Sequence, residues 1–500
     1  LERMDILNNR NIAVYKTSET TYPRTKPYHP SERFPEIAYD TLSEEPNNTF
    51  LSIRETLALL GLDRNNFGKP GWNPFGGFIK TGDTVVIKPN LVSHYNWGYR
   101  LGLKDTDSLI THGSVIRAVI DYVVIALAGK GTIIIGDSPI QSSSWPDIME
   151  MIGFKEIKFL FETIFPQVSL QSCDFRLDTA KLSKWGSYRR FEGDINENFI
   201  ETNLGSTSML SSITRSDTLF GVMDYSKKRL NETHSISSHK YLFPKQVIEA
   251  DVVINLPKLK SHSKAGITSA LKNLVGINGL KDYLPHFRLG SPTNGGDEYP
   301  DTGLLFKIIN NISHLEWECT SYLKRSGYNI LRRVLKQIYL MTTGQKNEIF
   351  STTAGGWYGN DTLWRTILDI NRGFLYTGTN GELNDGNTTE KKYFTLIDGI
   401  VGGENLSPLL PTPVRSGLII AGINPVAVDT VAATLIGFDY RKIPQISEAY
   451  NLKEYPLVNF STTEFKLFSN QGYNSLDDIV MSPDRLNFKP SIGFAGHIEL

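Results

Sequence analysis

The sequence is poor in cysteine, with only Cys173 and Cys319 among 500 residues. It contains neither a CxxC pair nor a cysteine cluster, which excludes an internal iron–sulfur cluster and a cysteine zinc site. A single disulfide between the two cysteines is the alternative, but a chain of this length does not need a covalent cross-link to be stable. We therefore expect two free thiols and no iron–sulfur cluster.

Long hydrophobic runs are also absent, and none reaches the roughly 18 residues of a membrane span. The nearest candidate, Val115–Ile135, contains Arg117, Asp121 and Lys130. The printed sequence opens without Met and without the apolar segment of a signal peptide, which is compatible with a cytoplasmic protein and with a signal peptide already removed. We favour the cytoplasm and expect no membrane span.

Neither sign of charge predominates in the sequence. It contains 52 Lys and Arg and 53 Asp and Glu, which gives a net charge of −1. This balance argues against a protein that coats nucleic acid and against a polybasic membrane protein. The patterns GxGxxG, GxxxxGK[ST] and GxSxG do not occur, so a dinucleotide fingerprint, a P-loop and a nucleophile elbow have no support. We expect no nucleic-acid partner.

Five short runs rich in β-branched residues predict buried strands, at residues 83–88, 131–136, 250–255, 393–398 and 416–421. Segments with helical spacing of apolar residues separate them. Continuous apolar strands that alternate with helices are typical of a mostly parallel sheet covered by helices on both faces. The predicted fold class is therefore α/β, with a mostly parallel central sheet flanked by helices.

The predicted organisation has four regions. Residues 1–80 form an N-terminal extension packed on the core, and residues 81–300 form a first α/β region with a polar, antiparallel, β-rich insertion at about 186–246. Residues 301–346 form a helical insertion whose second helix is basic. Residues 347–500 form a second α/β region that completes a cleft.

Polar side chains follow all five predicted strands, at the edge where α/β sheets bind their ligands. In strand order these residues are Lys88 and Asn90; Asp137; Lys258, Lys260, His262 and Lys264; Asp398 and Glu404; and Asn424. A solvated loop explains any one of these sets. Charged groups at the ends of buried strands need solvent or a ligand, and five sets together favour one shared site.

The segment PKLKSHSKAG holds three lysines and a histidine directly before a predicted helix N-terminus, which is an arrangement that suits a carboxylate or a phosphate. A solvated basic loop is the alternative. Lys272 and Asn273 lie two turns further along that predicted helix. The predicted substrate-binding residues are Lys88, Asn90, Lys258, Lys260, Lys264, Lys272 and Asn273.

The predicted catalytic residues are His262, Asp137 and Asp398. A histidine with a pKa near 6.5 suits acid–base catalysis, and the two carboxylates would orient a metal ion or the substrate. Candidate ligands for a divalent metal are His239, His286 and Glu404. No histidine pair has HExxH spacing, and a lone histidine is more often a hydrogen-bonded structural residue.

Several long segments carry a family resemblance. They are VVIKPNLV, THGSVIRAVIDYV with IIIGDSP, HKYLFPKQVIEADVVINLPKLKSH, SKAGITSALKNLVGINGLKDYLPH, GSPTNGGDEYP, GGWYGNDTLWRTILDINR, and DGIVGGENLSPLLPTPVRSGLIIAGINPVAVDTVAATLIGFDYRKIP. Between residues 83 and 445 the chain resembles the bacterial and archaeal proteins grouped as domain of unknown function 362. The family name itself assigns no activity.

The resemblance implies two further points. Many relatives carry an added ferredoxin-like segment with two four-cysteine motifs, which this sequence lacks. The family is also distantly similar to the lactate racemase group, whose two α/β domains enclose a nickel-pincer nucleotide held by a lysine and a histidine. From that group we carry over only the general idea of a cleft lined by lysine and histidine.

The leading hypothesis is an enzyme that acts on a small carboxylate- or phosphate-bearing substrate in a cleft lined by Lys, His and Asp, with or without a divalent metal. One alternative is a non-catalytic binding or accessory protein for surface glycans or their precursors. The other is a cofactor-maturation or redox-associated role, as the ferredoxin-bearing relatives suggest. The sequence does not assign the substrate, the reaction or the oligomeric state.

Overall fold

The computed structural model describes residues 5–102, 104–183, 186–191, 195–223, 225, 227–319, 321–344, 347–386 and 388–500. Its central sheet runs in the order β17-β1-β16-β15-β11-β2-β3-β4, with β12 paired to β15 and β13 to β12. The strands are β1 (Asn11–Lys16), β2 (Thr84–Pro89), β3 (Lys130–Asp137), β4 (Gln167–Asp174), β11 (Val252–Leu256), β12 (Lys258–His262), β13 (Gly266–Thr268), β15 (Lys392–Glu404), β16 (Thr412–Gly422) and β17 (Lys466–Ser469).

Strands β4, β3, β2, β11 and β15 pair in parallel, which confirms the predicted mostly parallel sheet. The fifth predicted strand has the opposite direction, because β16 pairs antiparallel with both β15 and β1. Its carboxyl end therefore lies at the other edge of the sheet. The expectation that Asn424 joins the other strand exits is wrong.

The fourth predicted strand is longer than expected, and a further strand follows the third. Strand β11 pairs with the first part of β15, and β12 continues along the second part after a break at Pro257, with Lys258 opposite Asp398. The segment KLKSH, which we placed at the polar exit of the third strand, is thus itself a strand. Since successive side chains of a strand alternate in direction, Lys258, Lys260 and His262 lie on one of its faces.

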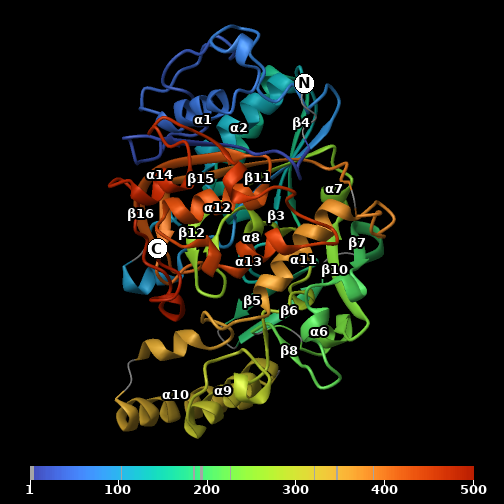
Figure 1. Cartoon of the computed structure of the whole chain (residues 1–500), viewed down its shortest axis with the longest axis vertical. Helices are drawn as coiled ribbons and strands as arrows, with labels where there is room; N and C mark the ends of the chain where they lie inside the picture. The colour runs from blue at the N-terminus through green and yellow to red at the C-terminus, as the bar shows by residue number, and fades with distance from the viewer. Residues whose placement is uncertain are drawn as a thin grey trace.

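Helices cover both faces of the sheet, as predicted. Figure 1 shows α1 (Asn48–Leu59) and α2 (Gly113–Ala126) on one side, and α8 (Ala270–Asn273), α11 (Leu363–Tyr376) and α12 (Pro425–Leu435) on the other. The remaining helices of the main body are α3 (Trp145–Met151), α4 (Phe154–Ile164), α5 (Ile195–Asn198), α6 (Lys227–Thr233), α7 (Lys245–Ile248), α13 (Pro444–Ser447) and α14 (Leu476–Met481).

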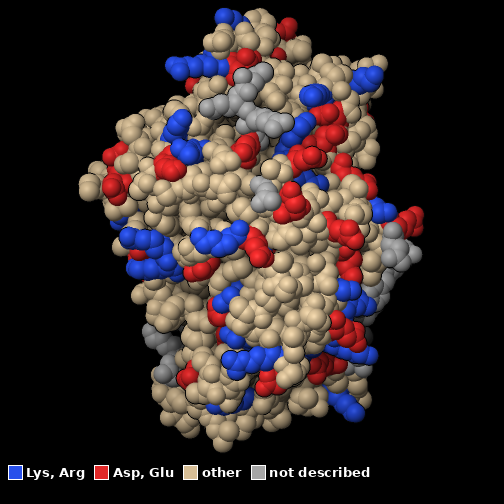
Figure 2. Space-filling model, turned by 45° about the vertical axis from the view of Figure 1, so that its right-hand side comes forward, with Lys and Arg blue, Asp and Glu red and all other residues tan. Residues whose placement is uncertain are grey.

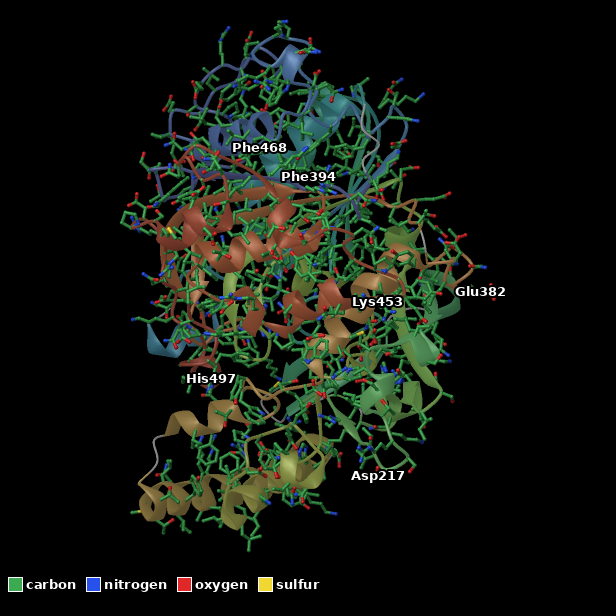
Figure 3. The ribbon with its side chains drawn as sticks, viewed as in Figure 1. Asp217, Glu382, Phe394, Lys453, Phe468 and His497 are labelled. Atoms are coloured by element: carbon green, nitrogen blue, oxygen red, sulfur yellow. The ribbon has the colours of Figure 1, made fainter. Side chains whose placement is uncertain are left out.

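The core lies between these layers. Phe394 of β15, labelled in Figure 3, is fully buried, and its ring packs on Phe75 with centroids 5.2 Å apart. The apolar candidate span around Val115–Ile135 forms α2 and β3, inside this core. Among the described residues, no helix combines the length and the apolar composition needed to cross a bilayer. Acidic and basic side chains are interspersed over the face shown in Figure 2.

The polar insertion is antiparallel, as predicted. It consists of β5 (Asp178–Ser183) with β6 (Gly186–Phe191), and of β7 (Phe199–Asn203) and β9 (His234–Ser235) on either side of β10 (Ser238–Pro244). A further short pair joins β8 (Phe220–Gly221) to β14 (Phe287–Arg288).

Two packed helices, α9 (Leu304–Glu318) and α10 (Tyr322–Thr343), occupy the predicted helical insertion. They lie at one end of the molecule, away from the central sheet (Figure 1). The N-terminal region supplies β1 to that sheet. The division of the chain into four regions stays a prediction.

Asn424 has a structural role that accounts for its position before α12. Its side chain accepts a hydrogen bond from Ala427 N (3.0 Å) and donates to the carbonyls of Ile6 (2.8 Å) and Leu457 (2.9 Å). We expect Asn424→Ala to lower the free energy of unfolding by about 2–4 kcal/mol, because it removes a helix cap and leaves two buried carbonyls without this hydrogen-bond donor. Urea titration would measure this, with the exposed Asn451→Ala as the control that stays near wild type. Equal midpoints for both variants would contradict it.

Candidate functional site

A buried ion pair joins the ends of β2 and β3. Lys88 Nζ lies 2.7 Å from Asp137 Oδ1 and donates to the Pro89 carbonyl (2.7 Å) and to Asn273 Oδ1 (3.1 Å). Asp137 also accepts hydrogen bonds from the amides of Leu91 (2.6 Å) and Ser138 (2.8 Å). Both members of the pair therefore have several protein partners.

The two asparagines predicted to bind substrate belong to this same network. Asn90 Nδ2 donates to Asn273 Oδ1 (3.0 Å), and Asn273 Nδ2 donates to Asn255 Oδ1 (2.7 Å). The backbone of Gly276 closes over the pair, because a Cβ built there would overlap Asp137 Oδ1 and lie 2.6 Å from Lys88 Nζ.

A second buried pair links β12 to β15. Lys258 Nζ lies 3.0 Å from Asp398 Oδ2 and donates to Tyr22 OH (2.7 Å), whose hydroxyl donates in turn to Asp398 Oδ1. His112 donates its amide to Asp398 Oδ2 (2.9 Å), and its ring stacks on Tyr22 with centroids 4.2 Å apart. Lys258 and Asp398 are thus enclosed by protein groups.

Lys260 is different, because it is fully buried without a carboxylate partner. Its Nζ donates to the Leu109 carbonyl (2.7 Å), and no ion pair within 4 Å joins it to the described residues. Burial, and then the charges of Lys258 and Lys272, hold its pKa well below the usual 10.5.

Two half-buried lysines complete a cationic group. Burial, followed by the charges of Lys281, Lys88 and Lys264, lowers the pKa of Lys272 to about 7. The Lys272 ammonium has no hydrogen bond or ion pair to the residues that the structure describes. Burial also lowers the pKa of Lys281 to about 8, although its Nζ donates to the Ser138 carbonyl (2.7 Å).

His262 and His286 border the same lysines, and burial followed by nearby lysine charges depresses both pKa values well below 6.5. His262 Nδ1 accepts from the Lys264 amide (3.0 Å), so its hydrogen is assigned to Nε2. His286 Nδ1 lies 2.7 Å from the Leu284 carbonyl, which assigns its hydrogen to Nδ1. The His262 ring thus offers a hydrogen-bond donor at Nε2, and the His286 ring offers an acceptor at Nε2.

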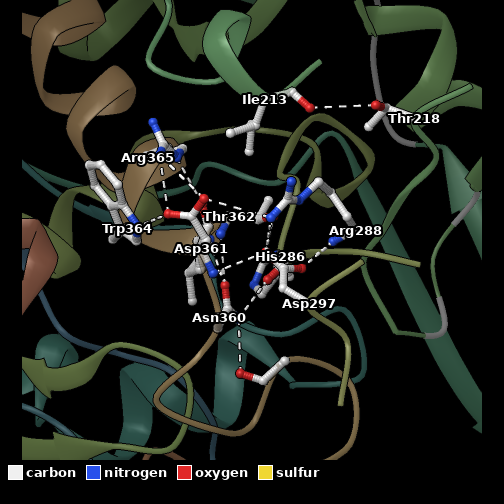
Figure 4. A network of polar contacts seen from close by, with 12 residues as sticks. Ile213, Thr218, His286, Arg288, Asp297, Asn360, Asp361, Thr362, Trp364 and Arg365 are labelled. Atoms are coloured by element: carbon white, nitrogen blue, oxygen red, sulfur yellow. Dashed lines mark hydrogen bonds and ion pairs between the residues drawn. The ribbon is translucent and has the colours of Figure 1, made fainter. Parts of the chain in front are cut away.

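A polar network holds the backbone at His286 (Figure 4). Asn360 Nδ2 donates to the His286 carbonyl (2.9 Å), and Asn360 Oδ1 accepts from the first amides of α11. Beside it, Asp297 accepts from Thr362 Oγ1 (2.6 Å) and the Arg288 amide (2.5 Å). Burial raises the pKa of Asp297 despite the Arg288 guanidinium.

The free helix amides that we predicted beside the anion site are already bonded within the protein. The segment AGITSALKNLVGI forms strand β13, then only the four residues of α8 and a 3₁₀ turn. The amides of Ala270 and Leu271 already donate to the Asp429 carboxylate of α12, at 2.6 and 3.0 Å. A carboxylate of the protein therefore occupies the position that we assigned to a ligand.

The three predicted metal ligands do not come together. His239 Nδ1 lies 3.3 Å from His234 Nδ1 in the antiparallel insertion, Glu404 accepts the amide of Lys489 (2.8 Å), and His286 lies among the lysines. Among the described residues, no group of three or more His, Cys, Asp and Glu side chains is placed to hold a metal ion.

We define the lysine cluster as Lys88, Lys260, Lys264, Lys272 and Lys281 with Asp137, His262 and His286. Two residues of this site were not among the predicted ones. Lys281 lies nine residues after Lys272 in a 3₁₀ turn, and Gly276 permits the close approach because it lacks a side chain. In KLKSH a basic residue or histidine stands at every second position, and this alternation indicates a strand rather than a loop.

Part of this site lies in a segment whose sequence matches a protein family. Residues 206–434 match the family model described as domain of unknown function (DUF362). This segment belongs to the DUF362 family. The DUF362 segment supplies Lys260, His262, Lys272 and Lys281, whereas Lys88 and Asp137 precede it.

Two further proteins have some similarity to this chain. The thylakoid-associated protein of Synechocystis sp. is 26% identical over 220 residues, which cover 44% of this chain and 47% of that protein. This chain thus spans about half the length of this curated relative. A solved protein from Thermotoga maritima has a TM-score of 0.31 at 10% identity, over 77% of this chain and 58% of the other.

Gly276→Ala tests the enclosure of the Lys88–Asp137 pair. A methyl group there must displace the pair, so we expect a loss of about 2–4 kcal/mol in the free energy of unfolding. The control is Gly77→Ala, where a Cβ meets nothing within 4 Å. Equilibrium urea unfolding gives both values, and a Gly276 variant as stable as the control would show that the pair is not enclosed.

The pKa of Lys272 predicts how stability depends on pH. Folding lowers this pKa from 10.5 to about 7, so the unfolded chain binds more protons between those values and stability rises with pH across that window. Lys272 contributes at most about 1.4 kcal/mol per pH unit. Urea unfolding from pH 7 to about 9 should show a smaller rise for Lys272→Met than for wild type and for the exposed control Lys228→Met. Equal slopes would contradict the prediction.

Proposed function

We propose that the protein is an enzyme that acts on a small carboxylate- or phosphate-bearing substrate at the lysine cluster. One observation carries the proposal: among the residues that the structure describes, Lys272 has no hydrogen-bond or ion-pair partner, and its pKa is lowered to about 7. Strongly perturbed pKa values beside a group of like charges are typical of functional sites.

The charge balance of the cluster supports an anionic ligand. Asp137 is the carboxylate that acts on the largest number of these lysines, namely Lys88, Lys260, Lys272 and Lys281. It already pairs with Lys88 and accepts hydrogen bonds from the amides of Leu91 and Ser138. Ser138 Oγ is buried and has no hydrogen-bond partner among the described residues, and it lies next to the carbonyl that accepts from Lys281. An anion would offset the repulsion among the ammonium groups and give this hydroxyl a partner.

The geometry favours Lys272 over His262 as the acid–base group. His262 Nδ1 is committed to the Lys264 amide, so this neutral ring offers a hydrogen-bond donor to negative charge rather than a base. A lysine with a pKa near 7 is poised to exchange a proton at neutral pH, and its neutral amine is also a nucleophile. In this proposal Lys260 and Lys281 hold the anion.

Calorimetric titration with phosphate and with small dicarboxylates tests the binding step. Lys272→Met should weaken binding at least tenfold, whereas Lys228→Met, at an exposed position, should bind as wild type does. Because an anion favours protonated lysine, affinity should fall as pH rises through about 7 to 8, by up to tenfold per pH unit for each proton taken up. Unchanged affinity in Lys272→Met would place the anion site elsewhere.

Lys272→Arg separates an enzyme from a non-catalytic binding protein. Arginine keeps the positive charge but does not release its proton near neutral pH. We expect this variant to retain binding within about tenfold and to lose turnover, followed by NMR of a small-metabolite mixture incubated with the protein. Turnover equal to wild type would contradict the role of Lys272, and binding without any turnover in wild type would favour the non-catalytic alternative.

A further inference from the structure

Helix α10 has an exposed apolar stripe. Leu323, Ile330, Val334, Ile338 and Met341 are 80%, 64%, 51%, 43% and 84% exposed. Their spacing of seven, four, four and three residues places them on one face of the helix. The stripe follows the length of α10, whose 22 residues span about 33 Å.

This stripe is not the face that packs on the rest of the protein. The buried side of α10 presents Tyr339 and Leu335, which join Phe306 and Ile309 of α9 in a small separate apolar cluster. Helix α9 adds three exposed apolar residues of its own, Leu304, Ile308 and Leu315. The hairpin of α9 and α10 therefore packs through one apolar surface and leaves a second apolar surface in contact with water.

The charge of α10 has one sign. It carries Lys324, Arg325, Arg332, Arg333 and Lys336, and no Asp or Glu. Glu316 of α9 pairs with Arg332 (2.7 Å). At 100° per residue, Lys324 and Arg333 lie on opposite flanks of the stripe. Apolar residues bordered by basic ones are the composition of a helix that lies in the interface of an anionic membrane.

We propose that α10 docks the protein on an anionic lipid surface, with the helix parallel to the membrane plane. The stripe would enter the boundary between headgroups and acyl chains while Lys324 and Arg333 contact lipid phosphates. The hairpin lies at one end of the molecule, away from the central sheet (Figure 1), so this docking leaves the sheet and the lysine cluster outside the bilayer.

Charge complementarity favours lipid over a second copy of the chain. Two α10 helices packed through the stripe would bring their basic flanks together, and α10 has no carboxylate to pair with them. A spanning helix is also unsuitable, because five charged residues within 22 would enter the hydrocarbon.

Vesicle sedimentation tests the proposal. We expect the full chain to bind vesicles of phosphatidylcholine with about 30% phosphatidylglycerol and to bind pure phosphatidylcholine far more weakly. Each removed basic group should weaken partitioning about fivefold, so Lys324→Gln with Arg333→Gln should weaken it about 25-fold. Ile330→Ser with Val334→Ser should reduce it at least tenfold.

Matched controls lie elsewhere on the surface. Phe159→Ser removes an apolar side chain that is 74% exposed on α4, and Lys228→Gln removes an exposed charge; both should bind vesicles as wild type does. Circular dichroism confirms that each variant is folded. Failure of wild type to bind anionic vesicles, or equal losses in the controls, would overturn the proposal. A dimer in sedimentation velocity that Ile330→Ser with Val334→Ser dissolves would instead assign the stripe to self-association.

Discussion

The burial of lysine ammonium groups at the carboxyl edge of the central sheet is the constraint on which the arrangement of this site depends. Removing an ammonium group from water is costly unless a partner replaces the lost hydration. Lys88 and Lys258 each have a carboxylate and further hydrogen-bond partners. Lys260 has one carbonyl, and Lys272 has none among the described residues. This gradation separates lysines whose charge is paired within the protein from lysines to which the proposed function assigns a ligand.

The burial of charged groups also explains two residues near the lysine cluster, Gly276 and Asp429. Gly276 is a glycine because the backbone passes too close to Asp137 for a side chain, and Asp429 caps α8 so that its amides are satisfied inside the protein. Burial raises the pKa of Asp429 to about 7, which shows that this carboxylate too is held at a cost. Positive charge is thus concentrated on side chains rather than on a helix terminus.

The net charge of the whole chain does not reveal the basic, apolar surface of α10. A net charge of −1 argued against polybasic membrane binding, yet one helix of 22 residues carries five basic groups and no acidic one. Its apolar stripe and the lysine cluster lie on different elements and share no residue. The proposed chemistry and the proposed docking therefore depend on separate observations and can fail separately.

The sequence by itself determined the α/β class, the five central strands and the antiparallel insertion, because these follow from local periodicity. It also selected most residues of the lysine cluster, since polar groups at strand ends stand out in one dimension. Only the tertiary structure decided that β16 runs antiparallel, that KLKSH is a strand, and which lysines have partners. Strand direction and ion pairing join residues more than a hundred positions apart, such as Lys258 and Asp398, and no local pattern records such contacts.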